Sequence, residues 1–453
     1  MPLETQPGPV QEPRHGRPRA SLHTLGCRLN QAETALLADR LKRDGYQLVA
    51  SGEPTDLFVL NSCSVTEDAE KDCRYQIRRT LRHSPHAFVA VTGCYAQTGV
   101  EALRRLPGID LIVGGRYKME LPDYLPAPSA LAKQPAPLVL HTKTIERTDF
   151  VLDGAGDYDS TRANLKIQDG CNFMCSFCNI PFARGHERSR QFSDIIREAE
   201  ALVERGHREL IVTGVNIGRY RHDGRSLLDV LKELEQIGGV ARIRISSIEP
   251  TTIPSALLDH MAASPKLCHY LHVPLQSGDD GILRAMNRRY RADEYGSFVR
   301  KASALIPDLC LGTDLMVGFP GETDRAFADS YRLVADLPLA YFHIFHFSAR
   351  PGTAAAKLHE SVPPATVSAR AQSLASLSRA KRLAFYQRFT GRTLSVLFEA
   401  KESNGLWTGW TDNYLRVGVR SDRALRKQIE PVVVTGVMDG LAVGHVSGSG
   451  GSA

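Results

Sequence analysis

Three cysteines lie close together near the middle of the chain, at Cys171, Cys175 and Cys178. Three thiolates at this spacing can each bind one iron of a four-iron, four-sulfur (4Fe-4S) cluster. The next cysteine is Cys268, so the fourth iron would stay open to an outside ligand. A zinc site completed by His186 is the alternative, although its spacing matches common zinc motifs poorly. We refer to these three cysteines as the loop trio.

Three further cysteines are spread over the first part of the chain, and each follows a short apolar run. Cys27, Cys63 and Cys94, here the strand-end trio, come after residues 20–24, 57–60 and 87–91, which we interpret as β-strands. Because ligands bind at the carboxyl ends of parallel strands, these thiols are expected to converge there. They could hold a metal cluster, or they could be buried thiols, which are common in sheets. The remaining cysteines fit neither pattern and are interpreted as structural: Cys73, Cys268 and Cys310.

The elements that would position these cysteines predict an α/β fold. Residues 19–125 alternate strand and helix signals, with a basic helix near 67–83 and a further strand at 111–113, which is typical of a parallel-sheet domain. Residues 126–156 are rich in proline and are interpreted as a linker. Residues 1–18 and 447–453 are interpreted as a disordered leader and a flexible tail.

The second unit, residues 157–388, repeats strand and then helix six times. Its strands are expected at residues 164–168, 209–215, 242–247, 270–274, 309–317 and 341–347. Six repeats predict a partial (β/α)6 barrel, with its active site at the carboxyl ends of the strands. The third unit, residues 389–446, carries five short strand-like runs separated by turn residues, which predicts a small β-barrel of the OB type.

Composition and charge narrow the class of protein. No run approaches the roughly 18 apolar residues of a membrane-spanning helix, and we find no secretory signal, so we expect a cytoplasmic protein with no membrane partner. The net charge is +6, and residues 361–398 contain Arg and Lys but no Asp or Glu. Such a stretch suits a polyanion such as nucleic acid, or it is a solvated helix face.

The cysteine motifs and several later segments resemble the radical S-adenosylmethionine (SAM) methylthiotransferase family. GCNFMCSFCNIPFARGHERSR is similar to the cluster loop of this family, and TLGCRLNQAET, VLNSCSVT and VTGCYAQ resemble the three cysteine motifs of its amino-terminal domain. GVNIGRY, SSIEP, HVPLQSGDDGILRAMNRRY, GFPGET and FHFSARPGTAA resemble motifs of its barrel. The third unit resembles the TRAM domain, a small RNA-binding barrel. The resemblance covers nearly the whole chain.

This resemblance implies SAM and two 4Fe-4S clusters as cofactors. The cluster on the loop trio would bind SAM and split it, with one electron, to a 5′-deoxyadenosyl radical. The auxiliary cluster on the strand-end trio would be tied to sulfur delivery, so that one SAM donates a methyl group and a second SAM is the radical source. A radical suits this task because no side-chain base could deprotonate an inert carbon near neutral pH. An external low-potential electron donor and a sulfur source are the implied partners.

The residues after the first cysteine, Arg28-Leu29-Asn30, indicate the substrate. They resemble those of enzymes that add a methylthio group to C2 of N6-threonylcarbamoyladenosine at position 37 of tRNA. Enzymes that act on isopentenyladenosine more often carry Gln-Met-Asn there, and those that act on a ribosomal-protein aspartate carry Pro-Lys-Asn. We therefore expect tRNA as the partner. The alternatives are isopentenyladenosine in tRNA, the ribosomal protein, and a non-catalytic iron–sulfur protein that binds RNA.

Four residues near the predicted cluster are candidates for SAM contacts. Phe177 could pack on the adenine, and Asn216, Glu249 and Gln276 stand at strand ends where polar groups could bond the ribose or the amino-acid part. The alternatives are loop packing for Phe177 and a buried polar network for the other three.

Cations and aromatic residues give the remaining candidates. The first set would offset the cluster charge, reach the RNA backbone or lie in solvent: Arg184, Arg188 and Arg190. The RNA-binding set combines cations with stacking surfaces, with core packing of the small barrel as the alternative for its aromatic members: Arg379, Lys381, Arg382, Trp407, Trp410 and Arg416.

Overall fold

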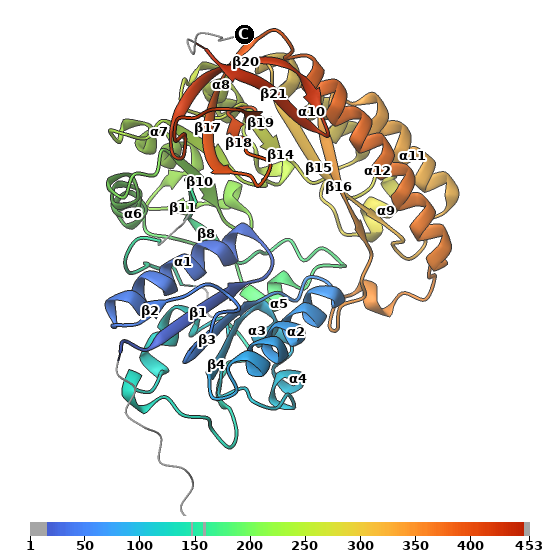
Figure 1. The fold of residues 1–453 in the computed structure, drawn as a ribbon. Helices are drawn as coiled ribbons and strands as arrows, with labels where there is room; N and C mark the ends of the chain where they lie inside the picture. The colour runs from blue at the N-terminus through green and yellow to red at the C-terminus, as the bar shows by residue number, and fades with distance from the viewer. Residues whose placement is uncertain (1–15, 146–147, 157–159, 448–453) are drawn as a thin grey trace, which may run out of the picture.

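The structure is a computed structural model that describes residues 16–145, 148–156 and 160–447. The predicted leader and tail fall mainly on residues 1–15 and 448–453, which lie outside the described residues. An amino-terminal sheet, a partial barrel and a small closed barrel follow one another along the chain and meet in space (Figure 1). The α/β fold class and the three architectures predicted from the sequence are confirmed.

The amino-terminal unit is a six-stranded parallel sheet in the order β2-β1-β3-β4-β5-β6. Its strands are Arg19–Thr24 (β1), Gln47–Leu48 (β2), Leu57–Ser62 (β3), Phe88–Gly93 (β4), Leu111–Val113 (β5) and Leu138–Leu140 (β6). Every residue of β3 and β4 is buried, as expected for central parallel strands that are covered on both faces. β6 pairs with β5, although it lies within residues 126–156, which their prolines predicted to be a linker.

The main helices of this unit are α1 (Arg28–Arg43) and α2 (Glu67–His83), with the shorter α3 (Cys94–Thr98) and α4 (Val100–Arg104) after β4. The apolar residues of α1 at helical spacing are buried against the sheet. The basic helix α2 begins where it was predicted because the hydroxyl of Thr66 accepts a hydrogen bond from the amide of Ala69 at 3.2 Å, and acidic residues fill its first turn.

The second unit contains the six predicted barrel strands. They are Arg162–Lys166 (β7), Glu209–Thr213 (β10), Arg242–Ile245 (β13), Tyr270–His272 (β14), Cys310–Val317 (β15) and Tyr341–His346 (β16). They form two three-stranded parallel sheets that are joined by the bridges Ile243↔Leu267 and Ser247↔His272. No pairing joins β7 to β16 within the residues that the structure describes, so the barrel stays open there, and α1 packs beside β7.

Helices separate these strands, as the repeat of strand and then helix predicts. They are α6 (Phe192–Glu204), α7 (Leu227–Gln236), α8 (Ser255–Ala263), α9 (Asp280–Ala285), α10 (Ala292–Leu305) and α11 (Asp324–Asp336). The long helix α12 (Pro364–Gln387) packs along β16 and leads to the third unit.

The third unit is a closed five-stranded barrel in the order β17-β18-β19-β21-β20. Its strands are Thr393–Lys401 (β17), Trp407–Thr411 (β18), Arg416–Val419 (β19), Ile429–Met438 (β20) and Leu441–Val446 (β21). The barrel is held to β13 by two arginines that donate to its backbone carbonyls. Arg242 bonds the carbonyl oxygens of Trp410 (2.9 Å) and Ser395 (2.6 Å), and Arg244 bonds that of Asp412 (2.8 Å).

Candidate functional site

The strand-end trio lies at one edge of the amino-terminal sheet. Cys27 directly precedes α1, Cys63 directly follows β3, and Cys94 directly follows β4. β1, β3 and β4 are adjacent parallel strands, with Thr24 opposite Asn61 and Ser62 opposite Gly93. The convergence expected from the sequence is therefore present, because three neighbouring strands end at the same edge.

The thiols of the strand-end trio interact with one another. Burial raises the pKa of the Cys63 thiol to about 11, and the charges of Cys94 and Cys27 act in the same direction. Burial also raises the pKa of Cys94, while the positive charges of Arg184 and Lys118 lower it. Three thiols in mutual electrostatic contact, with cations beside them, form a site that can bind metal as thiolates.

A glycine makes room for this arrangement. Gly26 has a φ of +96°, and a Cβ atom on it would lie only 2.9 Å from Sγ of Cys63. Any larger residue beside Cys27 would therefore push Cys63 out of place.

The loop trio lies beyond the first strand of the barrel, between β8 (Gln168–Asp169) and α5 (Ile180–Arg184). The amide of Phe173 donates to Sγ of Cys171 at 3.4 Å, and Nη1 of Arg288 donates to Sγ of Cys175 at 3.3 Å. Burial raises the pKa of Cys178 to about 12, and the charges of Cys175 and Cys171 add to this. Donors placed against sulfur stabilise thiolate ligands, so this loop fits an anionic iron–sulfur cluster.

The arrangement fits a cluster better than a single ion. Within the described part of the chain, no three His, Cys, Asp or Glu side chains converge closely enough to hold one metal ion. In a 4Fe-4S cluster each thiolate binds a different iron, so its sulfurs are spread more widely than around one ion. His186, the fourth ligand of the zinc alternative, belongs to no such convergent group among the described residues; its Nδ1 is hydrogen-bonded to Oδ1 of Asn172 at 2.9 Å.

A direct contact joins the two cysteine sites. Asn179 follows Cys178, and its side-chain amide donates to the carbonyl oxygen (2.7 Å) and the hydroxyl (3.2 Å) of Ser64, which follows Cys63. Both residues are buried. The contact fixes the end of the loop trio against the end of β3, so the two sites face the same interface.

A buried ionic network surrounds this contact. Glu33 of α1 binds Arg184 (2.9 Å), Lys118 (2.6 Å) and Lys166 (2.7 Å), and Asp169 binds Arg184 at 3.0 Å. These five residues come from both the amino-terminal unit and the barrel. Although burial alone would raise it, the pKa of Glu33 is held well below its usual range by Arg184, Lys118 and Lys166. The network therefore connects the two units through buried ion pairs.

The three loop arginines belong to this buried structure and not to an RNA-facing surface. Arg184 also donates to Oδ1 of Asn30 at 2.5 Å, and Arg188 pairs with Asp169 at 2.9 Å. Arg190 is fully buried and pairs with Asp194 at 2.6 Å. The expectation that they reach the RNA backbone or lie in solvent is therefore wrong, because each has carboxylate partners inside the fold. Arg184 lies near the strand-end trio, since its charge lowers the pKa of Cys94 and of Cys63.

Two of the four residues expected to contact SAM join strand-end networks. The backbone amide of Asn216 donates to Oε1 of Gln168 at 2.8 Å. Both oxygens of Glu249 accept from Nη2 of Arg288, at 2.8 and 2.6 Å. Because Arg288 also contacts Cys175, Glu249 lies next to the loop trio.

The other two differ in their surroundings. Phe177 is half-buried and packs on an apolar cluster that includes Met286 and Phe319. Gln276 lies four residues beyond the end of β14, has a φ of +75° and pairs with Leu315 through its backbone. Contact with SAM stays a prediction for all four residues.

The RNA-binding candidates divide into two groups. Arg382 and Trp410 line one cavity between α12 and the small barrel, and Arg416 is paired with Trp410 in the β18–β19 register. Arg416 also binds Glu402 at 2.7 Å. Arg379 is exposed on α12.

The remaining two candidates turn toward the interior. Nζ of Lys381 donates to the carbonyl oxygen of Leu337 at 2.8 Å, and burial lowers its pKa. Trp407 packs against the core of the small barrel. RNA contact by any of these six residues stays a prediction.

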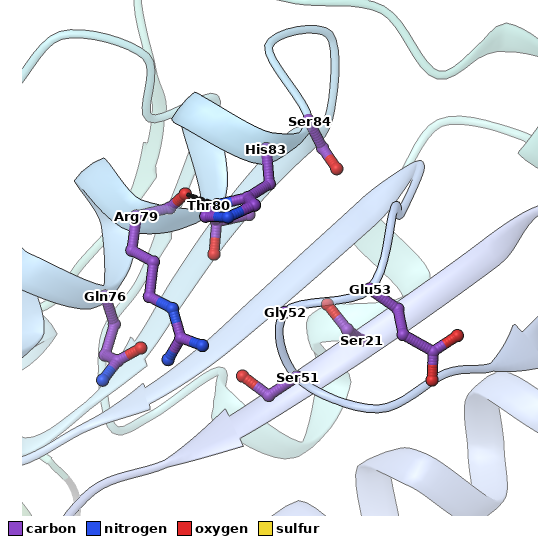
Figure 2. Close-up of a pocket in the computed structure, with 9 residues that line it drawn as sticks. All are labelled: Ser21, Ser51, Gly52, Glu53, Gln76, Arg79, Thr80, His83 and Ser84. Atoms are coloured by element: carbon purple, nitrogen blue, oxygen red, sulfur yellow. Dashed lines mark hydrogen bonds between the residues drawn. The ribbon is translucent and has the colours of Figure 1, made fainter.

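A crevice on the amino-terminal unit is too small to be a substrate site. It lies between α2 and the turn after β2, and its lining includes Gly52, Glu53, Arg79 and His83 (Figure 2). Its volume is about 10 Å³, enough for roughly one water molecule. It takes no part in the cysteine sites.

Sequence reasoning missed three residues that organise the site: Arg288, Asn179 and Glu33. Arg288 lies within HVPLQSGDDGILRAMNRRY, Asn179 directly follows the last loop cysteine, and Glu33 lies within TLGCRLNQAET, so all three stood inside segments that were already singled out. Their partners lie 39 to 151 residues away, which no local pattern reveals.

The described residues contain no helix that is both long and apolar enough to span a membrane. The three cysteines outside the trios are all buried, with Cys73 in the core of the amino-terminal unit and Cys268 and Cys310 in the core beneath the small barrel.

Comparisons with known proteins agree with this architecture. Residues 165–334 match the radical SAM superfamily, and residues 19–114 match the uncharacterized protein family UPF0004. The radical SAM methyltransferase TsrM from Kitasatospora setae has a similar fold, with a TM-score of 0.51 and 14% identity over 72% of each chain. At this identity the likeness shows the fold alone.

Curated relatives match over most of their length. Threonylcarbamoyladenosine tRNA methylthiotransferase MtaB from Bacillus subtilis is 33% identical over 88% of this chain and 89% of the relative. A tRNA-2-methylthio-N(6)-dimethylallyladenosine synthase from Cereibacter sphaeroides is 37% identical over 83% of this chain and 86% of the relative. With this similarity and with two cysteine trios at one interface, the chain belongs to the radical SAM methylthiotransferase family, whose members are enzymes that transfer a methylthio group.

Proposed function

We propose that this enzyme adds a methylthio group to C2 of N6-threonylcarbamoyladenosine at position 37 of tRNA. The motif Arg28-Leu29-Asn30 and the similarity to the MtaB enzymes of Bacillus subtilis and Aquifex aeolicus support this substrate. We propose two 4Fe-4S clusters, one on each trio, with one SAM as methyl donor and a second as radical source.

The hydrogen bonds from Asn179 to Ser64 are the observation that carries the proposal. Methylthiolation needs a radical source and a sulfur source to act on the same carbon, so the two sites must face a common space. Asn179 and Ser64 are the immediate neighbours of one cysteine from each trio, and their contact holds the two sites together.

When bound, SAM and the cluster on the loop trio would supply the radical that removes the inert hydrogen from the substrate carbon. The protein residues position these groups. Arg288 holds Cys175 and Glu249 in a fixed relation, at 3.3 Å and 2.6 Å. Arg184 places positive charge near Cys94, which favours the thiolate needed for iron binding.

The substrate RNA would meet the basic side of the molecule. Helix α12 and the following turn carry Arg379, Arg382 and Arg388 within a stretch that lacks Asp and Glu. We further propose that an external low-potential electron donor and a separate sulfur source serve the enzyme, and that it acts in the cytoplasm.

Nucleoside mass spectrometry of tRNA from a strain that lacks the gene tests the substrate. We expect 2-methylthio-N6-threonylcarbamoyladenosine to disappear, its unmodified precursor to accumulate, and the wild-type gene but not Cys178→Ala to restore the product. Loss of the methylthiolated isopentenyladenosine instead would assign the enzyme to the activity named for the Cereibacter sphaeroides relative. An unchanged profile would refute a tRNA substrate.

A further inference from the structure

A cavity of about 200 Å³ lies between α12, the small barrel and the first residues of β15 and β16. Its wall is mainly aromatic, with one arginine, and six of its lining residues carry the argument: Tyr341, His343, Arg382, Tyr386, Trp410 and Tyr414. None of these residues belongs to the two trios or to the ionic network, but Tyr414 contacts the amino-terminal unit: Nη2 of Arg28, the residue after Cys27, donates to its hydroxyl at 3.4 Å. The volume is sufficient for one planar heterocycle.

The rings of the wall are arranged as a stack. Trp410 and Tyr414 lie 4.5 Å apart between centroids with 21° between their planes, and Tyr414 and Tyr341 lie 6.3 Å apart with 27° between their planes. Tyr414 has a φ of +63°, a backbone conformation that is uncommon for a bulky residue. Such strain is typical of residues that are held in place for binding. Nearly parallel aromatic faces favour a further planar ring.

The polar groups of the cavity indicate the kind of ring. The guanidinium of Arg382 lies 4.9 Å from the centre of the Tyr341 ring and has no hydrogen bond or ion pair with another described residue. His343 likewise makes ring contacts but no hydrogen bond within the described part of the chain. Burial and the neighbouring His272 lower the pKa of His343, so its neutral ring can both donate and accept. A planar ring with hydrogen-bonding edges on an anionic backbone is a nucleobase of a polynucleotide.

The position of the cavity separates it from the reaction. Cys310 and Tyr341 are the first residues of β15 and β16, whereas the cysteine loops lie at the carboxyl ends of the barrel strands. At about 3.3 Å per residue, the eight residues of β15 span roughly 25 Å. A base in this cavity would therefore lie at the opposite end of the barrel strands from the loop trio, where the proposed radical source is bound, and would not be the base that reacts.

We infer that the cavity binds a second nucleobase of the substrate RNA, turned out of its stack onto Trp410 and beneath Arg382. This inference rests on the proposed function, because it takes RNA as the substrate. The second base would set the register of the RNA so that the reacting adenosine reaches the two cysteine sites. It would also let the enzyme select its RNA by a nucleotide that it does not modify.

Binding of an RNA hairpin with the sequence of a tRNA anticodon stem and loop tests the inference. Each loop nucleotide is replaced in turn by an abasic residue, and affinity for the full-length protein is measured by fluorescence anisotropy. We expect one abasic position, other than the modified adenosine, to weaken binding roughly 5- to 100-fold, the range for loss of one stacked base. Trp410→Ala should weaken binding of the intact hairpin to a similar degree but leave the hairpin with that abasic position unaffected.

Two further variants complete the experiment. Arg382→Gln changes an exposed helix residue and so leaves the barrel folded. It should weaken binding of the intact hairpin but not of the hairpin with the same abasic position. Arg379→Gln is the matched control, because this arginine is exposed on the same helix but does not line the cavity. It should weaken all hairpins by the same factor, as a phosphate contact does.

The outcomes separate the two proposals. Suppose that the hairpin binds and is methylthiolated, but that each variant weakens every abasic hairpin by the same factor as the intact hairpin. The second-base site is then overturned and the proposed function stands. If no RNA binds, both are overturned. Coupling at the modified adenosine alone would also overturn the inference, because the cavity would then hold the reacting base.

Discussion

Replacing Glu33 by Gln should loosen the interface between the amino-terminal unit and the barrel. The carboxylate of Glu33 is the single described partner of Lys118, at 2.6 Å, and it also binds Lys166 and Arg184. Both Glu33 and Lys118 are almost fully buried. Removing one member of a buried ion pair leaves the other charge without compensation, which costs about 3–5 kcal/mol.

Two comparisons isolate this cause. Glu53→Gln removes an exposed partner of Arg19, so it should cost less than about 1 kcal/mol. Adding Lys118→Met to Glu33→Gln removes the uncompensated charge and should recover part of the loss, as in a double-mutant cycle. If Lys118→Met does not restore stability in that background, the unpaired ammonium is not the cause.

Acid should have the same effect as the substitution. Since the pKa of Glu33 is held well below the ordinary glutamate value of 4.5, the folded protein binds fewer protons than the unfolded chain as the pH falls below that value. The stabilisation is therefore complete above about pH 4.5 and is lost as the pH falls through the lower folded pKa. Glu33→Gln should flatten this acid dependence.

Hydrogen–deuterium exchange of peptides from α1 and β7 measures the effect locally. A loss of about 3–5 kcal/mol corresponds to exchange that is faster by roughly 100- to 4,000-fold at these amides, provided that they open locally. The reasoning is refuted if exchange of α1 in Glu33→Gln is no faster than in Glu53→Gln.

Three further changes test the cysteine sites. After anaerobic reconstitution, Cys63→Ala should lower the iron content from about eight to about four per chain, whereas Cys73→Ala should retain about eight. If both variants lose the same amount of iron, the assignment of the strand-end trio is contradicted. Gly26→Ala should likewise lose the auxiliary iron, because its Cβ would meet Cys63. Gly45→Ala is the control: it has a similar φ of +93° but no neighbour within 4 Å, so it should cost only about 1 kcal/mol of stability, measured by urea unfolding. Asn179→Ala removes two buried hydrogen bonds between the sites, so it should leave the iron content intact but reduce methylthiolation in a single-turnover assay; undiminished turnover would show that this contact does not position the sites.

Patterns with a short period were sufficient to predict most of the fold. The apolar runs gave the positions of the six barrel strands and of β1, β3, β4 and β5, and the basic segment near residues 67–83 gave α2. The convergence of Cys27, Cys63 and Cys94 followed from topology alone, because adjacent parallel strands end at the same edge.

The same reasoning failed where a side chain finds its partner through the tertiary fold. Arg184 lies in the cluster-loop motif, which suggests that it offsets the cluster charge or contacts RNA, but its partner Glu33 lies 151 residues away. Lys381 stands between two exposed arginines, and only the packing of α12 turns it toward Leu337. β6 forms within a proline-rich segment because pairing with β5 supplies its hydrogen bonds, which local composition does not show.

The two trios differ in how much of the chain must fold before iron can bind. The loop trio spans eight consecutive residues, so its ligands are already near one another in an extended or newly synthesised chain. The strand-end trio draws on residues that are 67 positions apart and exists only when β1, β3 and β4 have paired in register. If each trio binds a cluster as proposed, the auxiliary site would become competent last, and its occupancy would report that the amino-terminal sheet is complete.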